Sequence, residues 1–423
     1  MGEADAAARA EARRWRARHL LLAPHRLGFF LATLVLLAAA LWWAAVQLMR
    51  GGHVPGLALS VSPSLVHAAV TSFGFMPLFF GGFLFTALPK WLHVPAPPAR
   101  RIAPPLLAQA AGWLIWLAGS HVHRLAACAG LALAAGGLLG MAIGFGRMVH
   151  ASVEPDRVHA RLIGLALAFG GLCLMAVAAC TAAGADRAAI GWVRSGLWGF
   201  VVAVFLVVAH RLIPFFTSEL FPASRWLRQS WSLWAMAGLA AFEAGAELLE
   251  AAGGRSDMQQ AARAGVELVA GAGVIWLCAR WRLAQNLALR WVGMLHLGFL
   301  WLGLSLLLAA AARLLTTATG EVQLPLAGLH ALGMGCLGTL MLTMVARISM
   351  AHAGRPVHAE GLLSGLLAAL QAATLLRIAA ALTFAGAQRI LTLAALLWLA
   401  LMFIWGIRHA SWYGRPRADH RPG

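Results

Sequence analysis

Long apolar runs separated by short polar segments follow one another along almost the whole chain. A helix needs about 20 predominantly apolar residues to cross a hydrocarbon core of about 30 Å, which is close to the length of most runs. The pattern predicts an all-α, polytopic membrane protein with about 12 transmembrane helices in one bundle. The predicted spans are 27–49, 65–88, 105–119, 125–146, 159–183, 192–212, 230–251, 260–279, 291–312, 324–349, 361–384 and 387–407.

The composition agrees with this class of protein. Hydrophobic residues make up 61% of the 423 residues and charged residues 11%, whereas a soluble domain has about 25% charged residues. The 33 Lys and Arg residues outnumber the 15 Asp and Glu residues. This excess does not indicate a nucleic-acid partner, because membrane proteins concentrate Lys and Arg in their cytoplasmic loops. With the N-terminus in the cytoplasm, 24 of the 33 basic residues fall on that side, which predicts an N-in, C-in topology and the lipid bilayer as partner.

The same pattern divides the chain. Residues 1–26 are predicted to form a basic cytoplasmic segment, 27–407 the twelve-helix membrane domain and 408–423 a short basic cytoplasmic tail. The first apolar run is too long for the central region of a cleavable signal peptide and lacks a clear cleavage site. We therefore expect it to remain as the first span.

Histidines inside the predicted spans are the first candidates for function, because ionisable side chains are expensive in lipid. His67 opens the second span, and His330 lies about 9 Å into the tenth at 1.5 Å per residue. The predicted topology places both in the outer half of the membrane. Two imidazoles on different helices can hold a haem iron from both faces. The alternative is that each histidine forms hydrogen bonds between helices.

Methionines follow His330 at helical spacing. Met334 lies at i+4 and Met341 at i+11, with Leu337 between them at i+7, so all are predicted to share its face. A thioether beside imidazoles suits Cu(I), which makes His67, His330 and Met334 a candidate copper site. Methionine at this spacing is also a common core residue.

Two weaker signals concern the surroundings of these histidines. Pro77 removes a backbone hydrogen bond in mid-span and should bend the second helix after His67. An aromatic cavity beside His67 would suit a flat cofactor. The phenylalanines expected around the bend are Phe73, Phe75, Phe79, Phe80, Phe83 and Phe85.

His121 and His123, in the short outer turn HVHR, form a second candidate for copper.

Three glutamates lie on one face of the seventh predicted span. Glu243, Glu247 and Glu250 are spaced i, i+4 and i+7, and like charges so placed repel one another. Such a ladder of carboxylates can conduct protons through a membrane. It can equally bind a buried arginine, for which Arg194 and Arg377 are candidates. The sequence leaves both interpretations open.

Three stretches of the chain together resemble the NnrS family of bacterial membrane proteins. They are SLVHAAVTSFGFMPLFFGGFLFTALPKW (64–91), AHRLIPFFT (209–217) and HALGMGCLGTLMLTMVARISMAHAGRP (330–356). The third is the most specific, and its matching residues are His330, Gly335, Gly338, Thr339, Arg347, His352, Gly354, Arg355 and Pro356. The first matches the family spacing at Gly74, Phe75, Gly82, Phe83, Thr86, Ala87, Pro89 and Trp91.

The resemblance implies a twelve-helix protein of the bacterial inner membrane, associated with haem and copper and with tolerance of nitric oxide. The five cysteines form no CxxCH motif, so such a haem would be of the non-covalent b type. Nitric oxide or a related small molecule is the implied partner. The residues that the topology and the resemblance together suggest for cofactor binding are His67, His330, His210, Arg211, Arg347 and His352.

The first stretch departs from the family at one point. Many relatives have Trp-His-Ala-His-Glu-Met, whereas residues 66–71 of this chain read Val-His-Ala-Ala-Val-Thr. Of the two histidines only His67 remains. A metal site that needs the second histidine and the glutamate therefore does not exist here in that form.

The leading hypothesis is a haem-binding inner-membrane protein, with copper as a further candidate cofactor, that acts in tolerance of nitric oxide and nitrosative stress. Whether it is an enzyme stays open at this point. The alternative is a proton-coupled transporter or channel, for which twelve spans, Pro77 and the acidic stripe give general support. A proton-pumping haem–copper oxidase or nitric oxide reductase is a weaker hypothesis, because such enzymes need several histidines converging on one binuclear centre.

Overall fold

The computed structural model describes residues 14–56, 58–220, 230–254, 256–280, 290–357, 361–382 and 386–419, without the side chains of 213–220 and 290. Within this part the chain forms helices and no strand, which confirms the prediction of an all-α, polytopic membrane protein. Residues 1–13 of the predicted N-terminal segment and 420–423 of the predicted tail lie outside the described residues.

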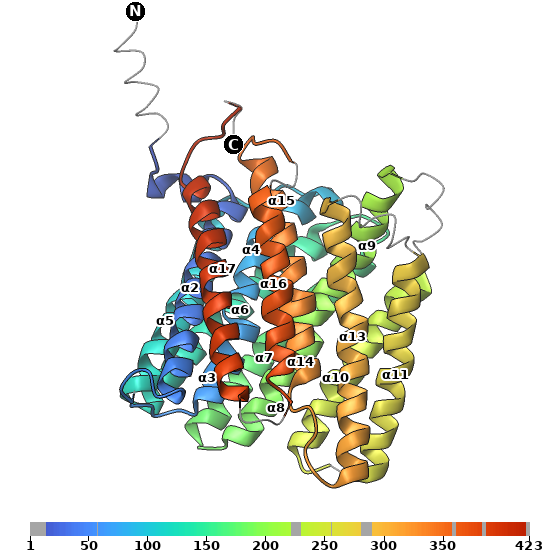
Figure 1. Cartoon of the computed structure of the whole chain (residues 1–423). Helices are drawn as coiled ribbons and strands as arrows, with labels where there is room; N and C mark the ends of the chain where they lie inside the picture. Colours follow the sequence, from blue (N-terminus) through green and yellow to red (C-terminus); the bar gives the residue numbers. More distant parts are fainter. Residues whose placement is uncertain are drawn as a thin grey trace, which may run out of the picture.

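The helices follow one another with short connections (Figure 1). In chain order they are η1 (Ala17–Leu22), α2 (Pro24–Arg50), α3 (Pro63–Phe73), α4 (Met76–Trp91), α5 (Ala99–Val122), α6 (Arg124–Ala151), α7 (Val158–Ala182), α8 (Asp186–Gly196), η2 (Leu197–Val202), α9 (Ala203–Leu220), α10 (Ser230–Ala251), α11 (Asp257–Arg280), α13 (Arg290–Thr319), α14 (Ala327–His330), η4 (Ala331–Gly338), α15 (Thr339–His352), α16 (Gly361–Ala379) and α17 (Ala387–Tyr413).

Eleven segments of the described chain are helical, long and apolar enough to cross a membrane. α10 is not among them, because its three glutamates lower its hydropathy. The ends of the chain nevertheless indicate that it crosses. The backbone N–H of Arg16 donates to the carbonyl oxygen of Gly414 at 2.8 Å, and Figure 1 shows the first described helix, in dark blue, and the end of α17 at the same end of the bundle. A chain whose ends meet on one side of a membrane crosses it an even number of times, so the eleven candidates together with α10 agree with the twelve predicted spans.

The same contact defines the two ends of the bundle. Nδ1 of His19 also lies 2.8 Å from the Gly414 oxygen, so the first and last described segments are held together. We call this end the terminal end and the opposite one the distal end. On the predicted N-in, C-in topology the terminal end faces the cytoplasm and the distal end faces outward.

The second predicted span is interrupted before Pro77. α3 ends at Phe73, and α4 begins at Met76 with Pro77 in its first turn. Proline has no N–H to donate and its ring clashes with the carbonyl four residues earlier, so it fits best at the start of a new helix. The expected bend after His67 is therefore a break between two helices. It separates His67, on α3, from most of the phenylalanines, on α4.

Two spans contain a π-helical segment. η2 links α8 to α9, and η4 links α14 to α15. Such wide turns are rare in proteins and often occur at functional sites. η4 begins directly after His330 and contains Met334, so it sets the relative positions of these two side chains.

Glycines let neighbouring helices touch through their backbones. A Cβ atom added at Gly112 of α5 would lie 2.5 Å from the carbonyl oxygen of Gly130 and 2.5 Å from the backbone nitrogen of Ala134, both on α6. Association of helices in lipid depends on van der Waals packing, which small residues make possible at short range. The α5–α6 hairpin is therefore a tightly packed unit at one side of the bundle.

Candidate functional site

A cavity of about 270 Å³ lies among the distal halves of six spans. We call it the histidine cavity. Its walls come from α2, α3, α8 with η2, α14 with η4, α16 and α17, and they are mostly apolar. The ionisable side chains that line it are His67, His330, Arg50, Arg194 and Arg377.

His67 is held in this cavity by an aromatic neighbour. Its ring stacks on Trp43 of α2, with 3.8 Å between ring centroids and 19° between planes. Nδ1 of His67 is buried and has no hydrogen-bond partner among the described residues. Stacking covers the faces of an imidazole and leaves the in-plane lone pair, which is the one that binds a metal. The position is therefore suited to a ligand residue.

His330 is fixed by the turn that precedes it. Its Nδ1 lies 2.9 Å from the carbonyl oxygen of Leu326, which places the proton on Nδ1 and leaves Nε2 free to bind a metal. Leu326 has a φ of 64°, in the left-handed region that residues other than glycine rarely adopt. Strain of this kind is found at functional sites.

Met334 lines the same cavity as both histidines, as the sequence pattern predicted for Met334 and His330. Leu337 does so too. Met341 does not: it lines a second, apolar cavity of about 60 Å³. The i→i+5 hydrogen bonds of η4 enlarge the helical turn, so residues beyond it no longer follow the α-helical phase counted from His330. The predicted stripe is therefore wrong at Met341.

The expected aromatic lining of the histidine cavity is also largely wrong. Phe75, at the break between α3 and α4, lines it. Phe79, Phe80 and Phe83 line the second cavity instead. α3 ends at Phe73 and α4 begins at Met76, so a pattern counted along one continuous helix does not hold. The aromatic ring beside His67 is Trp43, on a different span.

Three arginines line the histidine cavity, and no Asp or Glu of the described chain does. Arg194 lies 3.8 Å from Glu247, and Arg50 lies over the ring of Trp43 at 5.5 Å. No hydrogen bond or ion pair joins the side chain of Arg377 to another described residue. The cavity thus combines two imidazoles with an excess of positive charge.

The other residues suggested for cofactor binding lie away from this cavity. His210 is buried between helices, with Nδ1 3.1 Å from Nε2 of His159 and Nε2 3.1 Å from Oγ of Ser232. Both ring nitrogens therefore take part in interhelical hydrogen bonds, which is the structural alternative for such a residue. Arg211 lies over the ring of Trp91 at 4.3 Å.

His352 and Arg347 belong to α15, towards the terminal end. The ring of His352 lies 4.2 Å from that of His25, with 37° between planes. Arg347 is half-buried and does not line the histidine cavity. The structure therefore brings together His67, His330 and Met334 and places the remaining suggested residues elsewhere.

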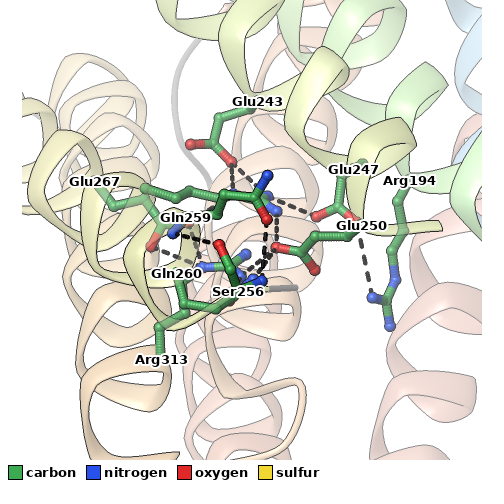
Figure 2. Close-up of polar contacts among 10 residues, drawn as sticks. Arg194, Glu243, Glu247, Glu250, Ser256, Gln259, Gln260, Glu267 and Arg313 are labelled. Carbon is green, nitrogen blue, oxygen red and sulfur yellow. Dashed lines mark hydrogen bonds and ion pairs between the residues drawn. The ribbon is translucent and has the colours of Figure 1, made fainter. Parts of the chain in front are cut away.

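The acidic stripe of α10, whose three glutamates are labelled in Figure 2, is bound by an arginine of the next span. Arg263 of α11 is 5% exposed and is surrounded by carboxylates. Its guanidinium nitrogens lie 2.6 Å from Glu243, 2.7 Å from Glu247 and 2.6 Å from Glu250. The stripe is therefore neutralised in large part by buried ion pairs.

A second arginine completes this cluster from α13. Arg313 bonds Glu250 at 2.5 Å and Glu267 at 3.1 Å. Arg194, proposed from the sequence, is 3.8 Å from Glu247. The other proposed partner, Arg377, is wrong, because it lines the histidine cavity. The cluster borders a cavity of about 620 Å³ that shares Arg194 with the histidine cavity.

The HVHR turn is engaged in local hydrogen bonds. Nε2 of His121 accepts from Nε1 of Trp42 at 2.7 Å, and its Nδ1 lies 2.9 Å from the carbonyl oxygen of Ala58. His123 accepts from the backbone N–H of Leu125 and so caps α6. In the part of the chain that the structure describes, no three His, Cys, Asp or Glu residues form a group able to hold a metal ion.

Sequence reasoning missed the residues that accompany the two histidines. These residues are Trp43, Arg50 and Trp398, which line the cavity. A charge near the end of a span was the available signal for Arg50 and Arg377. It did not reveal the cavity, because the sequence does not give the rotation of each helix about its axis.

Fold and site define a class: a multi-pass, all-α membrane protein with a half-buried histidine pair in a basic cavity. The family model described as NnrS protein matches residues 19–417, nearly the whole chain, so the protein belongs to the NnrS family. This membership makes it a membrane protein of the nitric oxide response at the level of the family. No curated protein matches the chain.

Proposed function

We propose that the protein binds haem in the histidine cavity and acts in the nitric oxide response in the bacterial inner membrane. The observation that carries this proposal is the position of His67 and His330, on separate spans and at the edge of one cavity. Nε2 of His330 is free for a metal because Nδ1 donates to Leu326. The His67 ring is held in place by Trp43 without using its nitrogens.

The residues present fit such a group. The cavity volume of about 270 Å³ is slightly below the range for small-molecule pockets, about 300 to 1,000 Å³. Accepting a whole macrocycle would therefore require lining side chains to change rotamer, which is common on binding. The mostly apolar walls keep water out, and the arginines supply positive charge for anionic substituents.

Nitric oxide is small, uncharged and soluble in lipid, so it needs no pore to reach the cavity. A haem held there would supply an iron atom that takes nitric oxide as a ligand. Of the two histidines, His330 is tied to Leu326 and is suited to stay in place. His67 is held by its stacking on Trp43 and makes no hydrogen bond to the described residues through Nδ1.

Copper is a second candidate cofactor because Met334 lines the cavity together with both histidines. Two imidazoles and a thioether are a soft ligand set that favours Cu(I). The ion pairs of the acidic cluster, in contrast, give no support to a proton-coupled transporter. Metal analysis of the purified protein separates iron from copper.

The test is a reduced-minus-oxidised difference spectrum of protein purified from cells supplied with haem and copper, together with metal analysis. We expect the spectrum of a b-type haem, and a large loss of bound haem in His67→Ala and in His330→Ala. His123→Ala is the matched control, because His123 caps α6 outside the cavity, and it should bind haem as the wild type does. Colourless, metal-free wild-type protein would refute the proposal, and full occupancy in both alanine variants would refute the assignment of ligands.

A further inference from the structure

The histidine cavity contains more positive charge than its own residues balance. Arg50, Arg194 and Arg377 line it, and none of its lining residues is acidic. Arg194 has Glu247 at 3.8 Å, whereas Arg377 forms no ion pair with the described residues. The connection that follows α16, residues 380–386, contains no acidic residue that could pair with Arg377.

The arginines line the same cavity as the two histidines. Arg50 also lies over the ring of Trp43, on which His67 stacks. Arg377 is half-buried in the last turn of α16, and Arg50 is the exposed last residue of α2. A guanidinium that faces an apolar cavity is stabilised by a negatively charged partner. No such partner for Arg377 is found among the described residues, which leaves a ligand in the cavity as its source.

We propose that the histidine cavity contains a binding site for an anionic oxygen group, a carboxylate or an inorganic oxyanion, held by Arg377 with Arg50 beside it. The planar fork of an arginine matches two oxygens of such a group and binds them with charge-assisted hydrogen bonds. The anionic group has two possible sources. One is haem itself, which carries two carboxylates at one edge, and for this source the inference rests on the proposed function. If haem occupies this cavity, Arg377 would hold those carboxylates.

A free inorganic oxyanion has the same chemistry and is the other source. Nitrite is the probe we choose for it, since it is small and carries two oxygens. The two sources differ in one respect that can be tested: blocking the carboxylates of haem as methyl esters removes the first and leaves the second unchanged.

The experiment uses the full-length protein in detergent, freed of haem and titrated with haem or with haem dimethyl ester. Calorimetry on the haem-free protein measures nitrite binding. Arg377→Gln removes the charge, and Arg377→Lys keeps it. Arg389→Gln is the matched control, because Arg389 is an exposed arginine on the neighbouring α17 and does not line the cavity.

For haem as the source, we expect Arg377→Gln to lower the affinity for haem by about ten- to a hundredfold. Arg377→Lys should lower it less, and Arg389→Gln should not change it. The dimethyl ester should bind equally weakly to wild type and to Arg377→Gln. The spectrum of the bound haem should be the same in all variants, because the histidines are intact, and a misfolded variant would not preserve it.

The other outcomes are distinct. Equal binding of haem and its ester, with nitrite bound by wild type and lost in Arg377→Gln, would support the site with a free anion as its occupant. A third outcome would overturn the anion site without contradicting the proposed function. In it, haem and its ester bind equally well, Arg377→Gln does not change haem affinity, and nitrite does not bind. Protein that binds no haem would refute the proposed function, and the nitrite measurement alone would then decide the anion site.

Discussion

The ion pairs between α10 and α11 allow a stability prediction to be worked from individual contacts. Arg263→Met removes the cation that contacts Glu243, whose side chain is 1% exposed and has no other cation within ion-pair distance among the described residues. Glu250 keeps Arg313 as a partner, and Glu247 keeps Arg194 at 3.8 Å. One buried carboxylate is thus left without compensation. Breaking a buried pair in this way costs about 3–5 kcal/mol, and we expect the free energy of unfolding to fall by about that amount.

A second substitution separates charge from packing. Glu243→Gln in the Arg263→Met protein removes the carboxylate that has lost its cation, at almost constant volume. If charge causes the loss, the double variant should recover about half of it, because replacing a whole ion pair is far less damaging than removing one member. Loss of packing alone would give no recovery.

Thermal unfolding in detergent provides the measurement. Cys278 on α11 and Cys336 on η4 are free and buried, so a thiol-reactive fluorescent dye reports their exposure as the protein unfolds. Arg187→Met, at an exposed position on α8, is the control and should melt like the wild type. The reasoning is refuted if Arg263→Met melts no lower than this control, or if the double variant melts no higher than Arg263→Met.

Two further predictions use the same unfolding assay. Gly112→Val should lower the free energy of unfolding by about 1–3 kcal/mol, because its Cβ would meet the backbone of α6 at 2.5 Å. Gly136→Val is the control and should have little effect, because no atom lies within 4 Å of its Cβ position. Equal melting temperatures of the two variants would contradict the close packing of α5 on α6. Gln371→Leu breaks the hydrogen bonds from Trp301 at 2.7 Å and to Thr339 at 3.0 Å. The free energy of unfolding should fall by about 1–2 kcal/mol, because a hydrogen bond within a membrane contributes about 0.6 kcal/mol on average and up to about 1.7. An unchanged melting temperature would show that other bonds replace these two.

The positions of the spans could be predicted because the thickness of the hydrocarbon core is recorded in the lengths of the apolar runs. The helices themselves extend further than the runs. The predicted span 105–119 corresponds to α5, Ala99–Val122, whose first turn contains Arg100 and Arg101. Charged residues are tolerated at the membrane surface, so hydropathy marks the apolar middle of a helix and not its ends.

The shared location of His67 and His330 could be predicted from their depth in their spans, but their neighbours could not. Which side chains face a cavity depends on the rotation of each helix, and the π turns of η4 change that rotation in mid-span. The acidic stripe illustrates the limit. Its main partner is Arg263, 13 residues after Glu250 on the adjacent helix, and no sequence pattern favours Arg263 over Arg377.

The histidine cavity is lined by arginines, whereas the cavity of about 620 Å³ beside the acidic cluster is lined by several carboxylates, and Arg194 lines both. On one side the carboxylates of α10 are taken up by Arg263 and Arg313 at 2.5 to 2.7 Å. Arg194 is only 3.8 Å from Glu247, so its pairing is weaker. None of those carboxylates lines the histidine cavity. They pair with Arg263 and Arg313 and not with Arg377, so the charge of Arg377 is available for a ligand of the histidine cavity.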